Sequence, residues 1–168
     1  MVQKNAKVIS LLQQKGGSGK TTTAINIACG LQELGLKVAI VDMDKDKPDA
    51  YSWMTKDDIV CDYVYNLDEK TVREKILDLK KTHDYIVIDT PPNFQTAALK
   101  SALLSDLVVI PCSPSGMDLS GLLEAKELAL TANKPYKLFA NRVQMQSNMS
   151  KSLINFIEDD GHFFKTFV

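Results

Sequence analysis

The sequence predicts an α/β fold, with a mostly parallel, doubly wound sheet that is covered by helices on both faces. Three observations support this prediction. Short apolar runs alternate with segments of helical periodicity, which is typical of parallel sheets buried on both sides. A glycine-rich segment, residues 14–23, lies between the first apolar run and the first helical pattern. The 168 residues are enough for a single domain, 1–168, with its own core.

Seven short apolar runs are expected to form strands. The third run is the weakest of them. The last run closes the chain and is apolar enough to need cover from other residues. In chain order, the expected strands are residues 7–12, 37–42, 59–65, 84–89, 107–111, 136–141 and 162–168.

Five segments between these runs are expected to be helical. The first has apolar residues three and four positions apart, which share one helical face: Ala24, Ile27, Ala28, Leu31 and Leu34. Gly35 follows them, where a helix commonly ends. The other expected helices are residues 69–81, 95–104, 119–133 and 150–159.

Residues 14–23, Gln-Lys-Gly-Gly-Ser-Gly-Lys-Thr-Thr-Thr, are predicted to form a phosphate-binding loop. Such a loop turns tightly and directs several backbone N–H groups at a polyphosphate. Lys20 would place a positive charge on the β and γ phosphates, and the Thr21 hydroxyl is a suitable Mg²⁺ ligand. The helix that follows adds the partial positive charge of its N-terminus. We therefore expect nucleotide contacts from Gly16, Gly17, Ser18, Gly19, Lys20 and Thr21.

The loop departs from the strict motif at its start, where Gln14 occupies the position of the first glycine. Lys15 follows this departure directly. Because Lys20 alone can neutralise a bound γ-phosphate, a second lysine at the rim could reach a nucleotide across an interface. Lys15 is therefore either a dimerisation residue or a solvated surface lysine, and spacing alone does not separate the two.

Three aspartates follow apolar runs, at the edge of the sheet where parallel folds bind ligands. Asp89, which precedes Thr90-Pro91-Pro92, suits a Mg²⁺-bound water because a hard cation beside phosphates prefers oxygen ligands. The alternative is a carboxylate that caps a turn. Asp42 and Asp44 share a face if the second strand continues. Either could orient an attacking water, and both could be structural.

Asn141 also follows an apolar run, within Asn141-Arg142-Val143-Gln144. GTP-binding domains use Asn-Lys-x-Asp at such a place, and the aspartate pairs with guanine. Gln144 lacks that carboxylate, so guanine is disfavoured and Asn141 is available to an adenine edge. This pattern favours ATP. The alternative is that Asn141 only caps the end of a strand.

Composition and charge exclude several classes of protein. The net charge of −1 does not require a nucleic-acid partner. Cys29, Cys61 and Cys112 lie far apart without a Cys-x-x-Cys pair, which excludes the usual zinc and Fe–S arrangements. The N-terminus is typical of neither a signal peptide nor a membrane span. We therefore expect a cytoplasmic protein.

These motifs together resemble the ParA/MinD group of deviant-Walker P-loop ATPases, most closely the small ParA proteins of plasmid partition. The similarity extends over nearly the whole chain, and its shared segments are 15–21, 41–44, 85–92 and 106–111. It implies ATP and Mg²⁺ as cofactors, and a nucleotide-dependent homodimer whose hydrolysis drives plasmid or chromosome segregation. It also implies non-specific DNA binding at the nucleoid and a ParB-like centromere-binding partner that stimulates slow hydrolysis.

The resemblance also implies roles for individual residues. Lys15 looks like the signature lysine that contacts nucleotide across the dimer, and Lys20 looks like the loop lysine. Thr21 looks like the Mg²⁺ ligand, and Thr22 would contact the α-phosphate. Asp44 looks like the residue that positions the hydrolytic water, and Asp89 looks like the aspartate that holds the metal through water.

Three features depart from the family pattern. Asp44 is followed by Lys45-Asp46-Lys47-Pro48 in place of Pro-Gln, as in members associated with conjugative transfer. Family chains continue past Val168, so a shortened gene product and a partner that covers the last strand are both open. The DNA-contacting residues of the family lie largely in that part. The basic residues that could replace them, without forming a run, are Lys134, Lys137, Arg142 and Lys151.

Other functions remain as alternatives to segregation. A MinD-like membrane positioning protein would need a C-terminal amphipathic helix, which this sequence does not show. An Fe–S carrier with the same loop would need paired cysteines. A non-hydrolysing nucleotide-binding scaffold fits the motifs and differs only in turnover.

Overall fold

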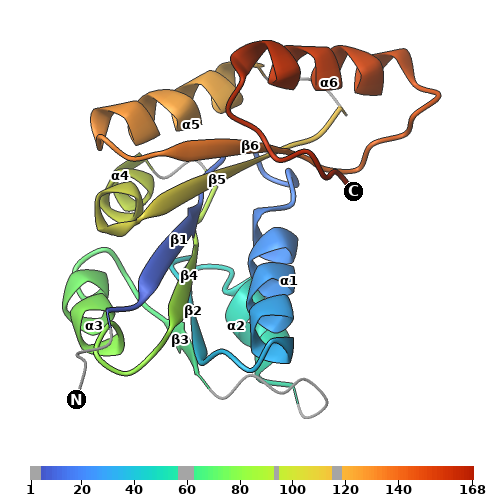
Figure 1. Cartoon of the computed structure of the whole chain (residues 1–168). Coiled ribbons are helices and arrows are strands. Elements are labelled where there is room, and N and C mark those ends of the chain that lie inside the picture. Colours follow the sequence, from blue (N-terminus) through green and yellow to red (C-terminus); the bar gives the residue numbers. More distant parts are fainter. Residues whose placement is uncertain (1–4, 57–62, 93–94, 115–118) are drawn as a thin grey trace.

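A single six-stranded parallel sheet forms the centre of the protein (Figure 1). The computed structural model describes residues 5–56, 63–92, 95–114 and 119–168. The strand order is β3-β2-β4-β1-β5-β6. The strands are β1 (Lys7–Leu11), β2 (Val38–Asp42), β3 (Val64–Asn66), β4 (Tyr85–Asp89), β5 (Leu107–Cys112) and β6 (Tyr136–Ala140). The predicted doubly wound parallel fold is confirmed.

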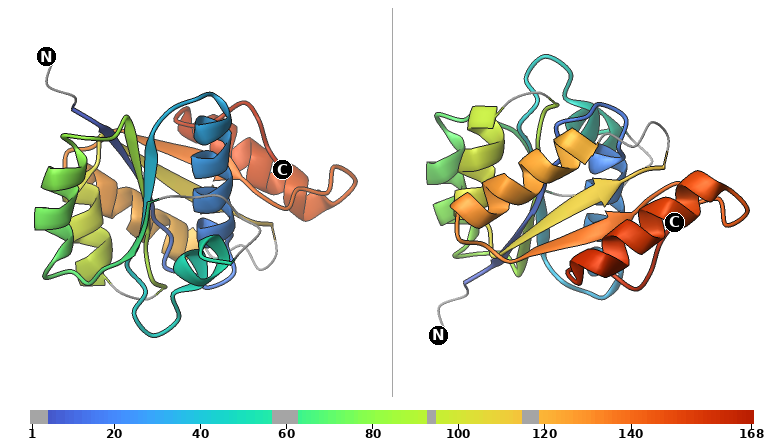
Figure 2. Two further views of the ribbon diagram at one scale, coloured as in Figure 1. Left: turned by 90° about the horizontal axis from the view of Figure 1, so that it is seen from below. Right: turned by 90° about the horizontal axis from the view of Figure 1, so that it is seen from above.

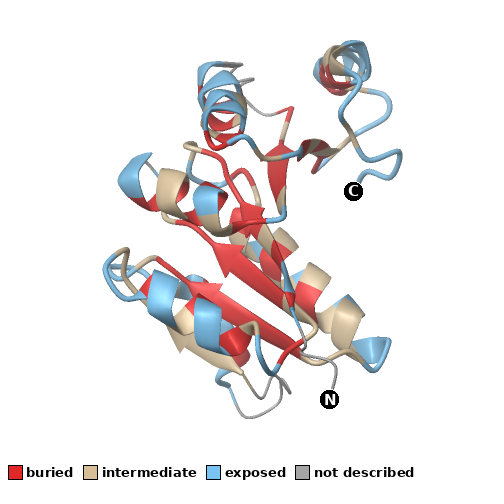
Figure 3. Ribbon diagram, turned by 60° about the vertical axis from the view of Figure 1, so that its left-hand side comes forward, coloured by how far each residue is buried: buried red, intermediate tan, exposed pale blue. Residues whose placement is uncertain are grey.

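Helices cover both faces of the sheet (Figure 2). Helices α1 and α2 pack on one face, and α3, α4, α5 and α6 pack on the other. Coverage on both sides explains why the central strands are apolar throughout, as in β2, where all five residues are buried (Figure 3). The helices are α1 (Lys20–Glu33), α2 (Asp49–Met54), α3 (Val72–Leu79), α4 (Gln95–Leu104), α5 (Leu119–Thr131) and α6 (Asn148–Asp160).

The prediction missed α2, which follows the polar segment 45–48. This helix has only six residues, of which Ala50 and Met54 are buried. Two buried positions four residues apart are too short a pattern to distinguish a helix from a loop in the sequence. The helix lies beside α1 and so brings the segment after β2 to the N-terminal end of α1 (Figure 1).

The prediction of a regular strand at 162–168 was wrong. The segment lies beside β6, but it forms only an isolated bridge between Leu138 and Phe163. Phe164 N–H donates to the carbonyl of Leu138, and Val168 N–H donates to the carbonyl of Ala140. The segment thus uses four residues where β6 advances by two, so a regular ladder cannot continue.

The weak run predicted at 59–65 is only partly within the described residues. Its described end contributes to the short strand β3 at Val64–Asn66, while 59–62, with Cys61, lie outside the described residues. In the part of the chain that is described, no helix combines the length and apolarity required to cross a bilayer.

Candidate nucleotide-binding site

The ends of three neighbouring strands lie level with one another at the edge of the sheet. In the parallel register, Leu11 of β1 and Asp42 of β2 both pair with Asp89 of β4. The glycine-rich loop leaves β1 just beyond this level and enters α1 at Lys20. The register therefore brings the loop and the strand-end aspartates together, as parallel sheets do at their carboxyl ends.

Two glycines of the loop adopt backbone angles that other residues rarely take. The φ angles of Gly17 and Gly19 are +77° and +98°. Gly19 is also packed closely, because a Cβ atom at this position would lie 2.0 Å from Nδ2 of Asn141. The Asn141 side chain is buried and donates a 3.1 Å hydrogen bond to the carbonyl of Ser18. Asn141 thus contacts the loop at both Ser18 and Gly19.

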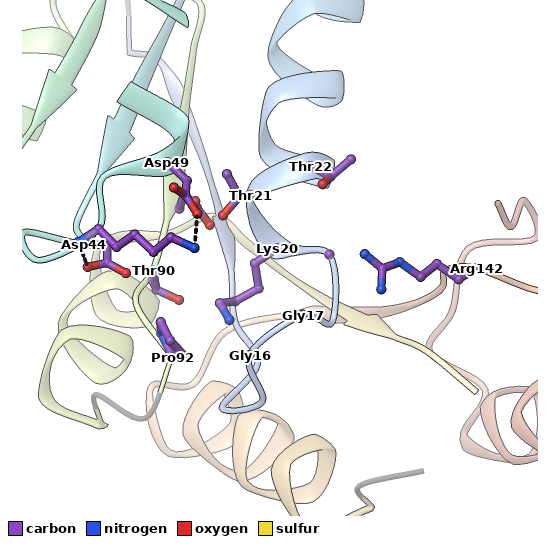
Figure 4. A pocket seen from close by; sticks show the side chains of 13 residues that line it. Gly16, Gly17, Lys20, Thr21, Thr22, Asp44, Asp49, Thr90, Pro92 and Arg142 are labelled. Atoms are coloured by element: carbon purple, nitrogen blue, oxygen red, sulfur yellow. Dashed lines mark hydrogen bonds and ion pairs between the residues drawn. The ribbon is translucent and has the colours of Figure 1, made fainter. Parts of the chain in front are cut away.

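A cavity of about 300 Å³ lies in front of the loop (Figure 4). It brings together most of the residues that the sequence singled out: Gly16, Gly17, Gly19, Lys20, Thr21, Thr22, Asp44 and Asp89. Lys15, Ser18 and Asn141 are not among the residues that line it. Ser18 and Asn141 are buried at the loop, whereas Lys15 is partly exposed at its start.

Lys20 is a buried cation within this cavity. Its Nζ donates a 3.3 Å hydrogen bond to the carbonyl of Lys15. Burial lowers the pKa of Lys20, while the nearby charges of Asp89 and Asp44 act in the opposite direction. An ammonium group removed from water interacts more strongly with a phosphate than an exposed one does. This placement suits the predicted contact with the β and γ phosphates.

Asp89 is buried at the end of β4. Burial raises its pKa to about 7, although a hydrogen bond with the Thr21 side chain acts against this rise. Its Oδ1 is buried and has no hydrogen-bond partner among the described residues. A buried carboxylate oxygen beside a threonine hydroxyl fits the surroundings of a Mg²⁺ ion, which prefers oxygen ligands and retains several waters.

Thr21 and Asp89 are the two candidate protein ligands of a metal ion in this cavity. Among the described ranges 5–56, 63–92, 95–114 and 119–168, three or more His, Cys, Asp or Glu side chains do not gather into a metal-binding cluster. Mg²⁺ is commonly held by one or two protein ligands together with substrate phosphates and water. Thr21 and Asp89 fit that pattern.

Replacing Asp89 with asparagine is expected to stabilise the metal-free protein at neutral and alkaline pH. The folded-state pKa of about 7 exceeds the ordinary value of 3.8. Ionisation therefore opposes folding, and its cost grows as pH rises between these two values and then stays constant. In EDTA, the melting temperature of Asp89→Asn should exceed that of the wild-type protein by several degrees above pH 7, and this difference should disappear toward pH 4. A difference in melting temperature that does not change with pH would contradict the raised pKa of Asp89.

The structure separates the roles of Asp42 and Asp44. The Asp42 carboxylate is fully buried, where it accepts backbone hydrogen bonds from Asp44 (2.9 Å) and Tyr51 (3.0 Å). Burial raises its pKa. Asp44 instead lines the cavity, with Oδ1 accepting a 2.9 Å bond from the N–H of Lys47. Asp42 therefore shapes the loop, and Asp44 is the carboxylate that can act on a ligand.

A second hollow, of about 320 Å³, lies next to the cavity in front of the glycine loop and shares Thr22 with it. Its walls come from α1, β6 and the final residue of the chain, and include Asn26, Phe139, Asn141 and Val168. The hollow is large enough for a nucleoside base, and Asn141 is among the residues that line it.

Three charged residues of the cavity were not assigned to the nucleotide site from sequence: Lys47, Asp49 and Arg142. Arg142 has a φ of +58°, uncommon outside glycine, and lies two residues beyond the end of β6. Its position after a strand end was a usable signal. The sequence instead grouped Arg142 with DNA-contact candidates, among which Lys134 precedes β6 and Lys151 lies in α6. The signal for Lys47 and Asp49 was hidden because α2 was not predicted.

Comparison with known proteins identifies the family. A family model described as an AAA domain matches residues 6–73 and 59–145. Maintenance of carboxysome distribution protein A from Gloeobacter kilaueensis is 30% identical over 145 residues, covering 84% of this chain. Soj, the sporulation initiation inhibitor protein of Bacillus subtilis, is 30% identical over 156 residues, covering 69% of this chain. The chain belongs to the ParA/MinD family of ATPases.

Solved structures share the fold of this ParA/MinD-family chain. A plasmid partition protein from Borrelia burgdorferi aligns with a TM-score of 0.78 at 22% identity, over 95% of this chain and 88% of that one. MinD from Pyrococcus horikoshii, complexed with Mg-ADP, aligns with a TM-score of 0.66 at 23% identity, over 86% and 73% of the two chains. The present chain spans 65% of the length of the Gloeobacter protein and 62% of Soj.

Proposed function

We propose that this ParA/MinD-family chain binds ATP with Mg²⁺, dimerises around the nucleotide and hydrolyses it slowly to drive the partition of plasmid or chromosomal DNA. The observation that supports the proposal most strongly is the convergence of Lys20, Thr21, Asp44 and Asp89 on one cavity in front of the glycine loop. Loop amides, a buried cation and two carboxylates are the parts that metal-assisted phosphoryl transfer requires.

The proposed roles follow from the placement of each side chain. Backbone N–H groups of residues 16–19 and the Lys20 ammonium bind the phosphates, and Thr22 contacts the α-phosphate on the way to the second hollow. Thr21 and Asp89 are the residues that would hold Mg²⁺, Asp89 through a bound water, and the ion would supply positive charge to the phosphates. Asp44 accepts a hydrogen bond from the attacking water and orients it toward the terminal phosphate.

Adenine is the proposed base, bound in the hollow beside Thr22. Asn141 is proposed to contact its edge with the carboxamide oxygen, because its Nδ2 already bonds to Ser18. The adenine N6 amino group is a donor that such an oxygen could accept from. Competition between ATP and GTP for binding to the purified protein tests this assignment, and equal affinity for the two would contradict it.

The proposed cargo is DNA, with a ParB-like centromere-binding partner and cytoplasmic, nucleoid-associated localisation. The fold shared with a plasmid partition protein supports this reading. A second candidate cargo comes from the relative that maintains carboxysome distribution. Phosphate release from ATP·Mg²⁺, measured with and without DNA and each candidate partner, distinguishes them. Stimulation by DNA with a ParB-like protein supports partition, and no turnover under any combination supports a non-hydrolysing scaffold.

Lys15→Ala is expected to retain ATP binding but to lose at least part of the ATP-dependent dimer, because we propose that Lys15 contacts the partner's nucleotide. Light scattering with and without ATP measures the change. Lys7→Ala is the matched control, since Lys7 is an exposed lysine at the opposite end of β1. An unchanged ATP-dependent dimer in the Lys15 variant would contradict the proposed contact of Lys15 with the partner's nucleotide.

A further inference from the structure

The loop between β2 and α2 is held firmly where it leaves the sheet. The side chain of Asn66, on β3, donates hydrogen bonds to the carbonyls of Asp42 (3.3 Å) and Asp44 (2.9 Å). The Asp42 carboxylate binds the N–H of Asp44 from the other side. The Asp44 carboxylate then accepts the N–H of Lys47. These bonds fix the path of the loop along the rim of the cavity in front of the glycine loop.

Two lysines of this loop have different surroundings. Lys45 Nζ lies 2.7 Å from Asp68 Oδ2, in an ion pair that does not line the cavity. Lys47 lines the cavity together with Lys20 and Asp44. Its Nζ lies 3.2 Å from Oδ2 of Asp49, which also lines the cavity, and its side chain is 79% exposed. Lys47 is therefore a cation at the cavity with an exposed partner.

The position of Lys47 in the cavity indicates which phosphate it can reach. Asp44 and Asp49 lie on one side of Lys20, and Arg142 lies on the other (Figure 4). The backbone bond to Asp44 keeps Lys47 on the Asp44 side. An attacking water held by Asp44 must lie beside the terminal phosphate, so Lys47 is the rim cation nearest to that end of a bound triphosphate.

The ion pair between Lys47 and Asp49 is easily exchanged. Exposed pairs of this kind contribute little to stability, because solvent screens them and both side chains lose rotamer freedom. A γ-phosphate offers the Lys47 ammonium group three charged oxygens within the partly enclosed cavity, and it is therefore a stronger acceptor than the exposed carboxylate of Asp49. A γ-phosphate would therefore displace Asp49 as the partner of Lys47, whereas a diphosphate presents no group at that place.

We propose that Lys47 is a ligand of the terminal phosphate, and that it leaves Asp49 when a triphosphate binds. This inference rests on the proposed function, and it assigns to Lys47 the preference of the site for a triphosphate over a diphosphate. Lys20 serves both nucleotides from within the loop, whereas Lys47 serves only the triphosphate from the rim.

Calorimetric titration of Lys47→Ala with AMPPNP·Mg²⁺ and with ADP·Mg²⁺ tests the proposal. Alanine keeps the backbone N–H that binds Asp44, so the loop geometry is preserved. We expect AMPPNP affinity to fall by about tenfold and ADP affinity by less than about twofold, which separates the two nucleotides by about 1 kcal/mol. Lys47→Arg should restore the preference. Lys45→Ala, two residues away and paired with Asp68, should change neither affinity.

Equal losses for the two nucleotides in Lys47→Ala, or no loss for either, would overturn the assignment of Lys47. A matching loss in Lys45→Ala would also overturn it, because the effect would then belong to the net charge of the loop. Failure of the wild-type protein to bind either nucleotide would instead contradict the proposed function. The two failures are therefore distinguishable in the same set of titrations.

Discussion

Gly19→Ala is expected to reduce ATP binding to background. A methyl group at this position would meet Nδ2 of Asn141 at 2.0 Å, and the φ angle of +98° is strained for any residue with a Cβ. Asn141 cannot withdraw easily, since its side chain is buried and bonded to Ser18. The loop must therefore shift, and its amides no longer converge on the phosphates. Calorimetry with AMPPNP·Mg²⁺ measures the loss.

Gly30→Ala is the matched control for this substitution. Gly30 lies on the same helix as Lys20, is exposed, and has no atom within 4 Å of an added Cβ. It should bind nucleotide normally and gain about 0.5–1 kcal/mol of stability, because alanine favours a helix over glycine. Lys20→Ala should also lose nucleotide binding, but for another reason, because it removes the positive charge proposed to contact the phosphates. Binding by Gly19→Ala within about twofold of wild type would show that the loop tolerates a side chain.

Asp44→Asn is expected to bind ATP normally and to lose hydrolysis by about 10²–10⁴-fold, the usual contribution of a positioned base. Asparagine has nearly the same shape and keeps an oxygen for the N–H of Lys47, but it accepts a hydrogen bond from water less strongly than a carboxylate. A dimer formed with ATP should then persist. Phosphate release and light scattering on one sample measure both effects.

Asp42→Asn separates chemistry from folding in this pair of aspartates. Both oxygens of Asp42 accept backbone N–H groups in a fully buried place. Asparagine would turn an N–H donor toward one of them, which leaves a buried donor unsatisfied and costs about 1–3 kcal/mol. We expect a lower melting temperature for Asp42→Asn and an unchanged one for Asp44→Asn. Normal turnover in Asp44→Asn would remove its proposed role.

Much of the fold was predictable because the central strands and helices produce recognisable patterns in consecutive residues. The strands β1, β2, β4, β5 and β6 were located to within a few residues, since strands buried on both faces consist mostly of apolar residues. The terminal segment 162–168 is apolar at four of its seven positions, yet all of its residues except Phe163 are exposed, and a single isolated bridge joins it to β6. An apolar run in the sequence therefore does not by itself decide burial or hydrogen-bond register, which also depend on the partner strand.

The candidate site also has features that were predictable from the sequence and features that were not. The glycine loop with Lys20 and Thr21 was predictable because its chemistry depends on neighbours in the chain. The difference between Asp42 and Asp44 was not, since both follow an apolar run and only the folded chain shows that Asp42 is buried against the N–H of Tyr51 in α2 while Asp44 lines the cavity. Lys47, Asp49 and the contact of Asn141 with Ser18 likewise depend on segments that meet only in the folded chain.

The sequence by itself therefore determined a parallel α/β protein of the ParA/MinD family with a phosphate loop, because periodicity and the loop motif are properties of consecutive residues. The tertiary structure decided which aspartate faces the cavity, which lysine lines its rim and why Gly19 has no room for a side chain. These outcomes depend on distances between atoms far apart in the chain, and such distances are set by the register of the sheet and the packing of helices on it.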